Sequence, residues 1–359
     1  MKIEIEIGRP RAINRTARVT IAAHELKSAA LHIAFAAERN RTGLYMRRHE
    51  KPCDVEAGYA VGPNDPVRFA EEPKKLKIPE HIKEMKFGTE PSSEIVAQDS
   101  ERFRTVPSVI AVPVSDVAAN LLRPCFMKTG FGEKQIFFFE DEPIESRSYW
   151  AACFFSDERN KAEIKFMDIR FNVDMDSVLS LDGQDLVARG LEWAVSLVPL
   201  VKNSKAVSPQ EIAKNDYDLR HIFGRNAQKE FFSPYDLWYD GWNQRVDEVV
   251  QKHIDSGIPF ETYYHSILGI DSYGSVVIYQ IDCELPKIAE QLAEEGVIAA
   301  GLLDSGGSCA IYDTWINGYL NHGWYFREPR GAILTFKLKS IERIPVPKTG
   351  TWHQSRQIL

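Results

Sequence analysis

The sequence predicts a mixed α/β protein, with a β-rich N-terminal region followed by a mixed sheet that contains a strand–helix–strand crossover. Apolar and polar residues alternate in short segments from the N-terminus onward, which is typical of strands with one solvent-facing side. A strand, a short helix and a second strand follow one another between residues 275 and 303, which is the order of a βαβ unit. The chain has 359 residues, which is too long for one small hydrophobic core.

The N-terminal region is marked by strand patterns and by one long interruption. Met1–Ile7 alternates apolar and acidic side chains, and residues 50–91 are rich in Pro, Lys and Glu with little periodicity, which predicts a long excursion or linker. We divide the chain into a β-rich region of unknown role (1–160), a second domain (161–345) and a C-terminal tail (346–359). Strands before residue 200 are expected at 1–7, 17–23, 108–114, 135–139 and 162–176. Residues 30–37 are compatible with a strand, and their alanines are equally compatible with a helix.

Two helix starts are clear in the middle of the chain. Ser208-Pro209 provides a cap residue followed by proline at the first helical position, and Glu211 stands three residues after the cap. Ser233-Pro234 repeats this pattern, and a helix could continue over residues 237–254, although Gly241 would weaken or interrupt it.

The segment from residue 275 to residue 304 is the best-specified unit. Ser275–Ile281 and Val297–Leu303 have strand patterns, and Pro286–Glu295 has the apolar spacing of a short helix that Gly296 ends. A right-handed parallel crossover is expected from this order. It would place Asp304 at the carboxyl end of a strand, where open α/β sheets bind their ligands.

Asp304 is followed at once by a turn that exposes backbone N–H groups. The residues are Ser305-Gly306-Gly307-Ser308, and two adjacent glycines let the backbone approach a ligand closely. A carboxylate beside such N–H groups suits a sugar or a phosphate.

Composition excludes several classes of protein. The net charge of −7 gives no reason to expect nucleic acid as a partner. No apolar run reaches the length of a membrane span, and the alternating N-terminus has no signal-peptide core, so we expect a cytoplasmic protein without a membrane partner. Five dispersed cysteines without CxxC spacing indicate buried thiols rather than a disulfide scaffold. The sequence does not indicate an oligomeric state.

The segment around Asp304 is similar to a known family pattern. An apolar strand runs into Leu303-Asp304-Ser305-Gly306-Gly307-Ser308, and Asn317-Gly318, Asn321 and Arg327 precede a last apolar strand. This order resembles the phosphodiester glycosidase family, with its N-acetylglucosamine-1-phosphodiester α-N-acetylglucosaminidase-like domain, in which Leu-Asp-Gly-Gly-Gly-Ser follows the strand. The resemblance covers roughly residues 190–340 and includes, more weakly, Pro199-Leu200-Val201-Lys202.

The chain departs from the family pattern at two places near Asp304. Ser305 replaces the first glycine of the triplet, and His265-Ser266 stands where the family has Arg-Thr. These replacements predict a changed substrate or a lost reaction.

The resemblance implies a hydrolase that cleaves the glycosidic bond of a sugar-1-phosphodiester or a related sugar phosphate. Such cleavage passes through an oxocarbenium-like transition state, which a carboxylate stabilises. We therefore expect Asp304 to be the catalytic carboxylate and His265 to carry a proton. The leaving phosphate needs neutralising donors rather than a strong acid. Contacts to this small-molecule or glycan substrate are expected from Gly306, Gly307, Ser308, Arg327, Asn317 and Asn321.

Other interpretations of the same residues remain open. Gly306–Ala310 has the spacing of a nucleophile elbow around Ser308, but an elbow is followed by a helix and residues 309–312 have a strand pattern. The fold could also serve a non-catalytic glycan-binding, nucleotide-sugar-binding or assembly protein. His265 also fits a structural histidine, and Asp271 fits the cap of a hairpin turn.

No cofactor is indicated with certainty. No His or Cys cluster has zinc spacing. Calcium is the candidate that remains, because Asp304, Asp313 and nearby carbonyl groups offer the oxygen ligands that this cation prefers.

Overall fold

The computed structural model describes residues 2–7, 15–33, 76–77, 109–116, 124–128, 134–139, 147–156, 162–215, 222, 242–306, 309–313, 318–322 and 331–339. Strands predominate in these ranges, and every pairing between their named strands is antiparallel. The protein is therefore more β-rich than the mixed α/β class that the sequence predicts.

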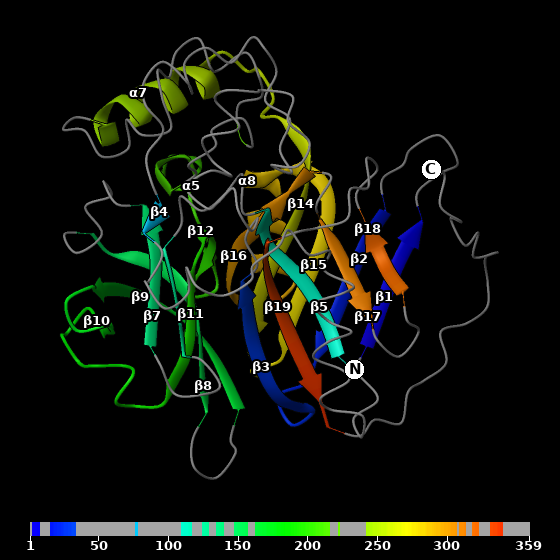
Figure 1. Cartoon of the computed structure of the whole chain (residues 1–359). Helices are drawn as coiled ribbons and strands as arrows, with labels where there is room; N and C mark the ends of the chain where they lie inside the picture. The colour runs from blue at the N-terminus through cyan, green and yellow to red at the C-terminus, as the bar shows by residue number, and fades with distance from the viewer. Residues whose placement is uncertain are drawn as a thin grey trace, which may run out of the picture.

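Three sheets make up the described fold (Figure 1). The central sheet has seven strands in the order β1 (Lys2–Ile7), β2 (Arg15–Ile21), β15 (Val276–Glu284), β14 (Thr262–Asp271), β16 (Val297–Ser305), β12 (Val198–Lys202) and β13 (Lys205–Ala206). The second sheet has the order β10 (Ser177–Ser180), β9 (Ala162–Asn172), β8 (Tyr149–Ser156), β11 (Leu191–Ser196), β6 (Cys125–Lys128), β7 (Lys134–Phe139) and β4 (Leu76–Lys77). The third sheet has the order β18 (Gly318–His322), β17 (Ala310–Asp313), β5 (Val109–Asp116), β19 (Gly331–Leu338) and β3 (Leu26–Ile33).

Strands from the two ends of the chain share the same sheets. β2 pairs with β15 in the central sheet, and β3 pairs with β19 in the third sheet. The predicted division at residue 160 falls between β8 and β9, which pair with each other along their length. Sheet pairing therefore does not follow that division.

The predicted crossover is present, but its two strands are not neighbours. β15 and β16 both run antiparallel to β14, which lies between them, so they point in the same direction. The sequence predicts that Asp304 ends a strand of a parallel sheet. The parallel pairing is wrong, because β16 pairs antiparallel with its neighbours, but Asp304 does lie at the end of a buried strand. The sequence gives no direct signal that β14 inserts between the two strands.

Helix α8 (Leu285–Glu294) connects these strands and contacts β12, β15 and β16. Leu285, Ile288 and Leu292 recur at helical spacing and are all buried. Burying each such side chain stabilises the fold by about 2 kcal/mol. Pro286 stands in the first turn, and Gly296 follows the helix at φ +82°, a backbone conformation that glycine adopts without strain.

Two further helices lie at one end of the molecule (Figure 1). α5 (Pro209–Asn215) begins as the sequence predicts, because the Ser208 hydroxyl accepts a hydrogen bond from the Glu211 N–H at 3.2 Å. α7 (Trp242–Asp255) begins directly after Gly241. The second predicted helix start, at Ser233-Pro234, lies outside the described residues.

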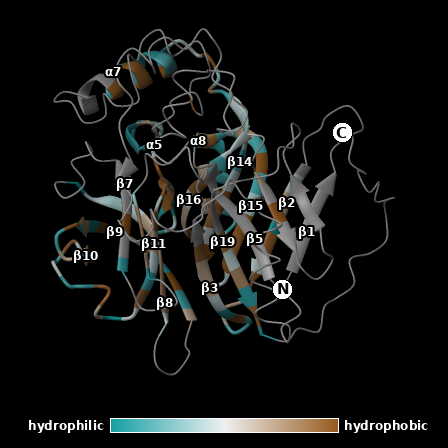
Figure 2. Ribbon diagram, in the orientation of Figure 1, coloured by the Kyte–Doolittle hydropathy of each residue, from teal (hydrophilic) through white to brown (hydrophobic). Residues whose placement is uncertain are grey.

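β16 lies where the sheets meet. It pairs within the central sheet and also contacts β5 of the third sheet and β8 of the second. The Trp150 indole N–H on β8 donates to the Ala300 carbonyl on β16 at 3.3 Å, and the chain passes from β11 to β12 through buried Leu197. Apolar residues concentrate along β8, β11, β12 and β16 (Figure 2).

Candidate functional site

The site begins at the end of β16, where Asp304 is held beside β14. The register pairs Ser266 with Asp304 and His265 with Ser305. Asp304 is only 2% exposed, and its Oδ1 accepts a hydrogen bond from the Ser305 N–H at 2.8 Å. The backbone therefore fixes the carboxylate at the point where the strand ends.

Buried polar side chains surround Asp304 on one face of the central sheet. Gln280 of β15 donates from Nε2 to the Ser266 hydroxyl at 3.2 Å, and the Tyr264 hydroxyl donates to Gln280 Oε1 at 3.4 Å. Because residues opposite each other in antiparallel strands point to the same side, Asp304 shares this face with Ser266 and Gln280. We call this the Asp304 face. Tyr264, Ser266 and Gln280 are buried and bonded to one another, so they form a polar layer inside the sheet beside the carboxylate.

A second carboxylate lies on the Asp304 face. Asp282 of β15 is opposite Tyr264 in the register and is partly buried. Burial raises the pKa of the Asp282 carboxyl above its ordinary value of 3.8. A carboxyl with a raised pKa keeps its proton to higher pH, which is the property of a general acid.

His265 points to the opposite face. Its Nδ1 lies 2.7 Å from the Ser305 hydroxyl oxygen, and its ring is fully buried against the edge of Tyr263, with 5.9 Å between the ring centroids. Side chains alternate along a strand, so His265 and its neighbour Ser266 face opposite sides. The two residues predicted to be catalytic, Asp304 and His265, are thus neighbours in the backbone register but do not share a face.

Gly306 begins the turn that follows β16. Its φ of +86° is a left-handed conformation that favours glycine. A Cβ atom at this position would lie 2.7 Å from the Tyr263 hydroxyl, so that hydroxyl stands directly over the turn. The predicted glycine after Asp304 is therefore favoured by its backbone conformation, and the Tyr263 hydroxyl lies against it.

The other predicted substrate contacts are only partly described. The backbone of Asn321 lies in β18, next to β17, and Ile311 is its partner in the register. Asp313, the second residue proposed to hold calcium, ends β17. Gly307, Ser308, Asn317 and Arg327 lie outside the described residues, and their roles stay predictions.

Several residues near Asp304 were not singled out from the sequence. Gln280 sits in a segment with an ordinary apolar strand pattern, and its only signal is a polar side chain at a buried position. Tyr263 acquires its position through pairing between β14 and β16, which the sequence does not reveal. The predicted hairpin cap is confirmed, because Asp271 Oδ1 accepts hydrogen bonds from the N–H groups of Tyr273 and Ser275.

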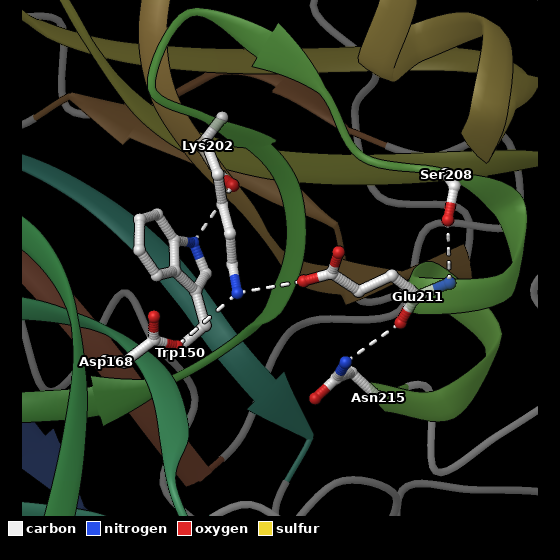
Figure 3. A network of polar contacts seen from close by, with 7 residues as sticks. Trp150, Asp168, Lys202, Ser208, Glu211 and Asn215 are labelled. Carbon is white, nitrogen blue, oxygen red and sulfur yellow. Dashed lines mark hydrogen bonds and ion pairs between the residues drawn. The ribbon is translucent and has the colours of Figure 1, made fainter. Parts of the chain in front are cut away.

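A separate polar network surrounds Lys202 on β12 (Figure 3). The Lys202 ammonium lies 2.9 Å from Glu211 Oε1 and 3.4 Å from Asp168 Oδ1, and 4.8 Å from the centroid of the Trp150 ring. These contacts join α5 to the central and second sheets. The two carboxylates neutralise the ammonium, so we interpret the network as structural.

A surface hollow of about 640 Å³ lies between α5 and α7, away from Asp304. None of the predicted site residues lines it.

Metal binding gains no support from the described residues. Among them, no group of three His, Cys, Asp or Glu side chains could hold a metal ion. Calcium binding stays a prediction. No helix in the described part of the chain is long and apolar enough to cross a membrane.

Comparisons with known proteins give only distant similarity. No protein-family model matches the chain, and no curated protein matches it. The catalytic domain of zebrafish N-acetylglucosamine-1-phosphodiester α-N-acetylglucosaminidase, auto-inhibited by its pro-peptide, is 11% identical with a TM-score of 0.39. That similarity covers 95% of this chain and 83% of the zebrafish chain. A hypothetical protein from Synechocystis is 10% identical with a TM-score of 0.37, covering 93% and 61% of the two chains. Similarity at this level does not establish function.

Proposed function

We propose that the protein is a hydrolase that cleaves the glycosidic bond of a sugar-1-phosphodiester or a related sugar phosphate. The observation that carries the proposal is the Asp304 carboxylate. It is fixed by the Ser305 N–H at the end of a buried strand, immediately before the left-handed turn at Gly306. A sugar phosphate requires a carboxylate at the anomeric carbon and donors to the phosphate, and this position of Asp304 before the turn supports the first of these roles.

Asp304 would stabilise positive charge at the anomeric carbon as the bond to the phosphate oxygen breaks. It acts either as the nucleophile or as the base that activates water, and Gly306 and the residues after it offer N–H groups to the phosphate. The bonds among Ser266, Gln280 and Tyr264 would hold the strands on either side of Asp304 in register.

Asp282 is our candidate for the group that protonates the leaving oxygen. It lies on the same face as Asp304, on the far side of β14. Two strand spacings and two residues along the strand separate their Cα atoms by about 12 Å. The carboxyl groups of inverting glycosidases lie about 6.5–9.5 Å apart, so the role of Asp282 requires the two side chains to extend toward each other.

A non-catalytic sugar-phosphate-binding protein is the second candidate. It is favoured by the burial of Asp304, which is 2% exposed, and by the orientation of His265 toward the other face. Burial keeps water away from the Asp304 carboxylate, and His265 lies on the wrong face to take a proton from water there.

The test uses a panel of sugar-1-phosphodiesters and nucleotide sugars followed by phosphorus NMR. We expect wild type to release a phosphomonoester from a sugar-1-phosphodiester, or a nucleoside diphosphate from a nucleotide sugar, and Asp304→Asn to reduce the rate by about 10²-fold or more. Asp255→Asn, which neutralises an exposed carboxylate at the end of α7, is the matched control. Binding without turnover in wild type would favour the second candidate, and neither binding nor turnover would refute both.

A further inference from the structure

Ser305 and His265 form a close pair on the face opposite Asp304. The Ser305 Oγ and His265 Nδ1 atoms lie 2.7 Å apart, which is within hydrogen-bonding distance. This contact brings together a hydroxyl and an imidazole.

The surroundings of the pair have the parts of a nucleophilic site. His265 is fully buried, whereas Ser305 is partly exposed. The His265 Nδ1 atom faces the Ser305 hydroxyl and is the group that can accept its proton. The backbone turns away at Gly306, directly after Ser305, and leaves the hydroxyl at the end of its strand.

Tyr263 supplies a hydrogen-bond donor beside the same serine. The side chain is 40% exposed, its ring packs edge-on to His265, and its hydroxyl stands over Gly306. A donor placed there could stabilise an oxyanion that forms next to Ser305.

We propose that Ser305 is a nucleophile activated by His265, and that this end of the central sheet hydrolyses small uncharged carboxylic esters. Tyr263 and the Gly306 backbone carry no charge, which is why the substrate class is an uncharged ester. The site lies on the opposite face of the sheet from Asp304 and does not depend on the glycosidase reaction.

The chemical step is that of a serine–histidine pair. With the ring proton on Nε2, the Ser305 hydroxyl donates to His265 Nδ1. Oγ forms a bond to the carbonyl carbon, the carbonyl π electrons move to its oxygen, and the hydroxyl proton passes to Nδ1. When the tetrahedral intermediate collapses, the bond to the alkoxy group breaks and Nδ1 returns the proton to the leaving alcohol. Water then attacks the acyl-serine by the same route and releases the acid.

The experiment is labelling of the folded wild-type protein with a fluorophosphonate probe, in which the serine oxygen displaces fluoride at phosphorus. Peptide mass spectrometry then locates the adduct. We expect modification of Ser305, and no label in Ser305→Ala. His265→Gln should slow labelling by about 10²-fold or more, because the proton acceptor is removed. Ser256→Ala is the matched control, because Ser256 also bonds to a histidine, but through the backbone carbonyl of His253.

Three results would overturn the proposal: an unlabelled wild type, a label on Ser308, or unchanged labelling of Ser305→Ala. Because the His265 substitution is buried and could disturb folding, Ser305→Cys provides a second reading. A thiol beside a neutral imidazole should be alkylated by iodoacetamide faster than free cysteine at the same pH. A rate equal to or below that of free cysteine would contradict activation by His265.

Discussion

The packing between β12 and β16 predicts that Gly301→Ala destabilises the protein. Gly301 lies on β16 three residues before Asp304 and is fully buried. A Cβ atom added there would lie 2.6 Å from the Leu197 Cβ and 3.1 Å from the Val198 carbonyl oxygen. Both atoms are fixed by the backbone, so a rotamer change cannot relieve the contact, and the two strands must move apart.

Two opposing effects decide the size of the change. Alanine in a strand gains about 0.5–1 kcal/mol over glycine through lower backbone entropy. Inserting a methyl group into a well-packed core costs about 1–3 kcal/mol. We expect the steric cost to exceed the entropic gain, which leaves a net loss of about 1–2 kcal/mol in the free energy of unfolding.

Urea unfolding followed by tryptophan fluorescence measures this loss, and Trp150 reports directly because it bonds to Ala300. The matched background is Leu197→Gly, which removes the side chain that the new methyl group meets. In that background Gly301→Ala should become neutral or stabilising. A stabilising effect of Gly301→Ala in wild type, or the same loss in both backgrounds, would refute the reasoning.

Three further predictions follow from the described geometry. Burial raises the pKa of the Asp282 carboxyl above its ordinary value of 3.8, so a general acid at this position keeps its proton to higher pH. Glycosidase activity should fall as the pH rises through the raised pKa. In Asp282→Asn the pH–rate profile should lose this fall. Gly306→Ala should lower the free energy of unfolding by about 1–2 kcal/mol, because alanine is strained in a left-handed backbone conformation. Gly183→Ala is the control in thermal unfolding, because Gly183 has φ +84° and no atom lies within 4 Å of the added Cβ. The control therefore measures the backbone cost without a contact to Tyr263. Burial raises the pKa of Cys125 to about 12 and raises that of Cys153 as well, so both thiols should resist iodoacetamide at neutral pH until the protein unfolds; alkylation of the native protein would contradict this.

The local elements could be predicted from the sequence because each is encoded by nearby residues. Alternation in Met1–Ile7 corresponds to β1, and the predicted helix at Pro286–Glu295 differs from α8 by one residue at each end. The Ser208 cap and the Asp271 turn are confirmed, because these side chains bond to N–H groups two to four residues away. Short-range chemistry of this kind does not depend on the rest of the fold.

The pairing of distant strands could not be predicted in the same way. β14 inserts between β15 and β16, and β2 joins the same sheet from the N-terminus, because several apolar strands compete for the same edges. The candidate site depends on that pairing. The prediction of Asp304 rests on a local motif, whereas the contact between His265 and Ser305 joins residues 40 positions apart. The separation of Asp304 and His265 onto two faces follows from the register alone.

The most direct test of the central claim is hydrolysis of a sugar-1-phosphodiester in ¹⁸O-labelled water, followed by phosphorus NMR of the product. Cleavage of the glycosidic bond leaves the bridging oxygen on phosphorus, so the account predicts an unlabelled phosphate, ¹⁸O in the released sugar, and loss of both products in Asp304→Asn. Incorporation of ¹⁸O into the phosphate would show attack at phosphorus, and would contradict the role assigned to Asp304.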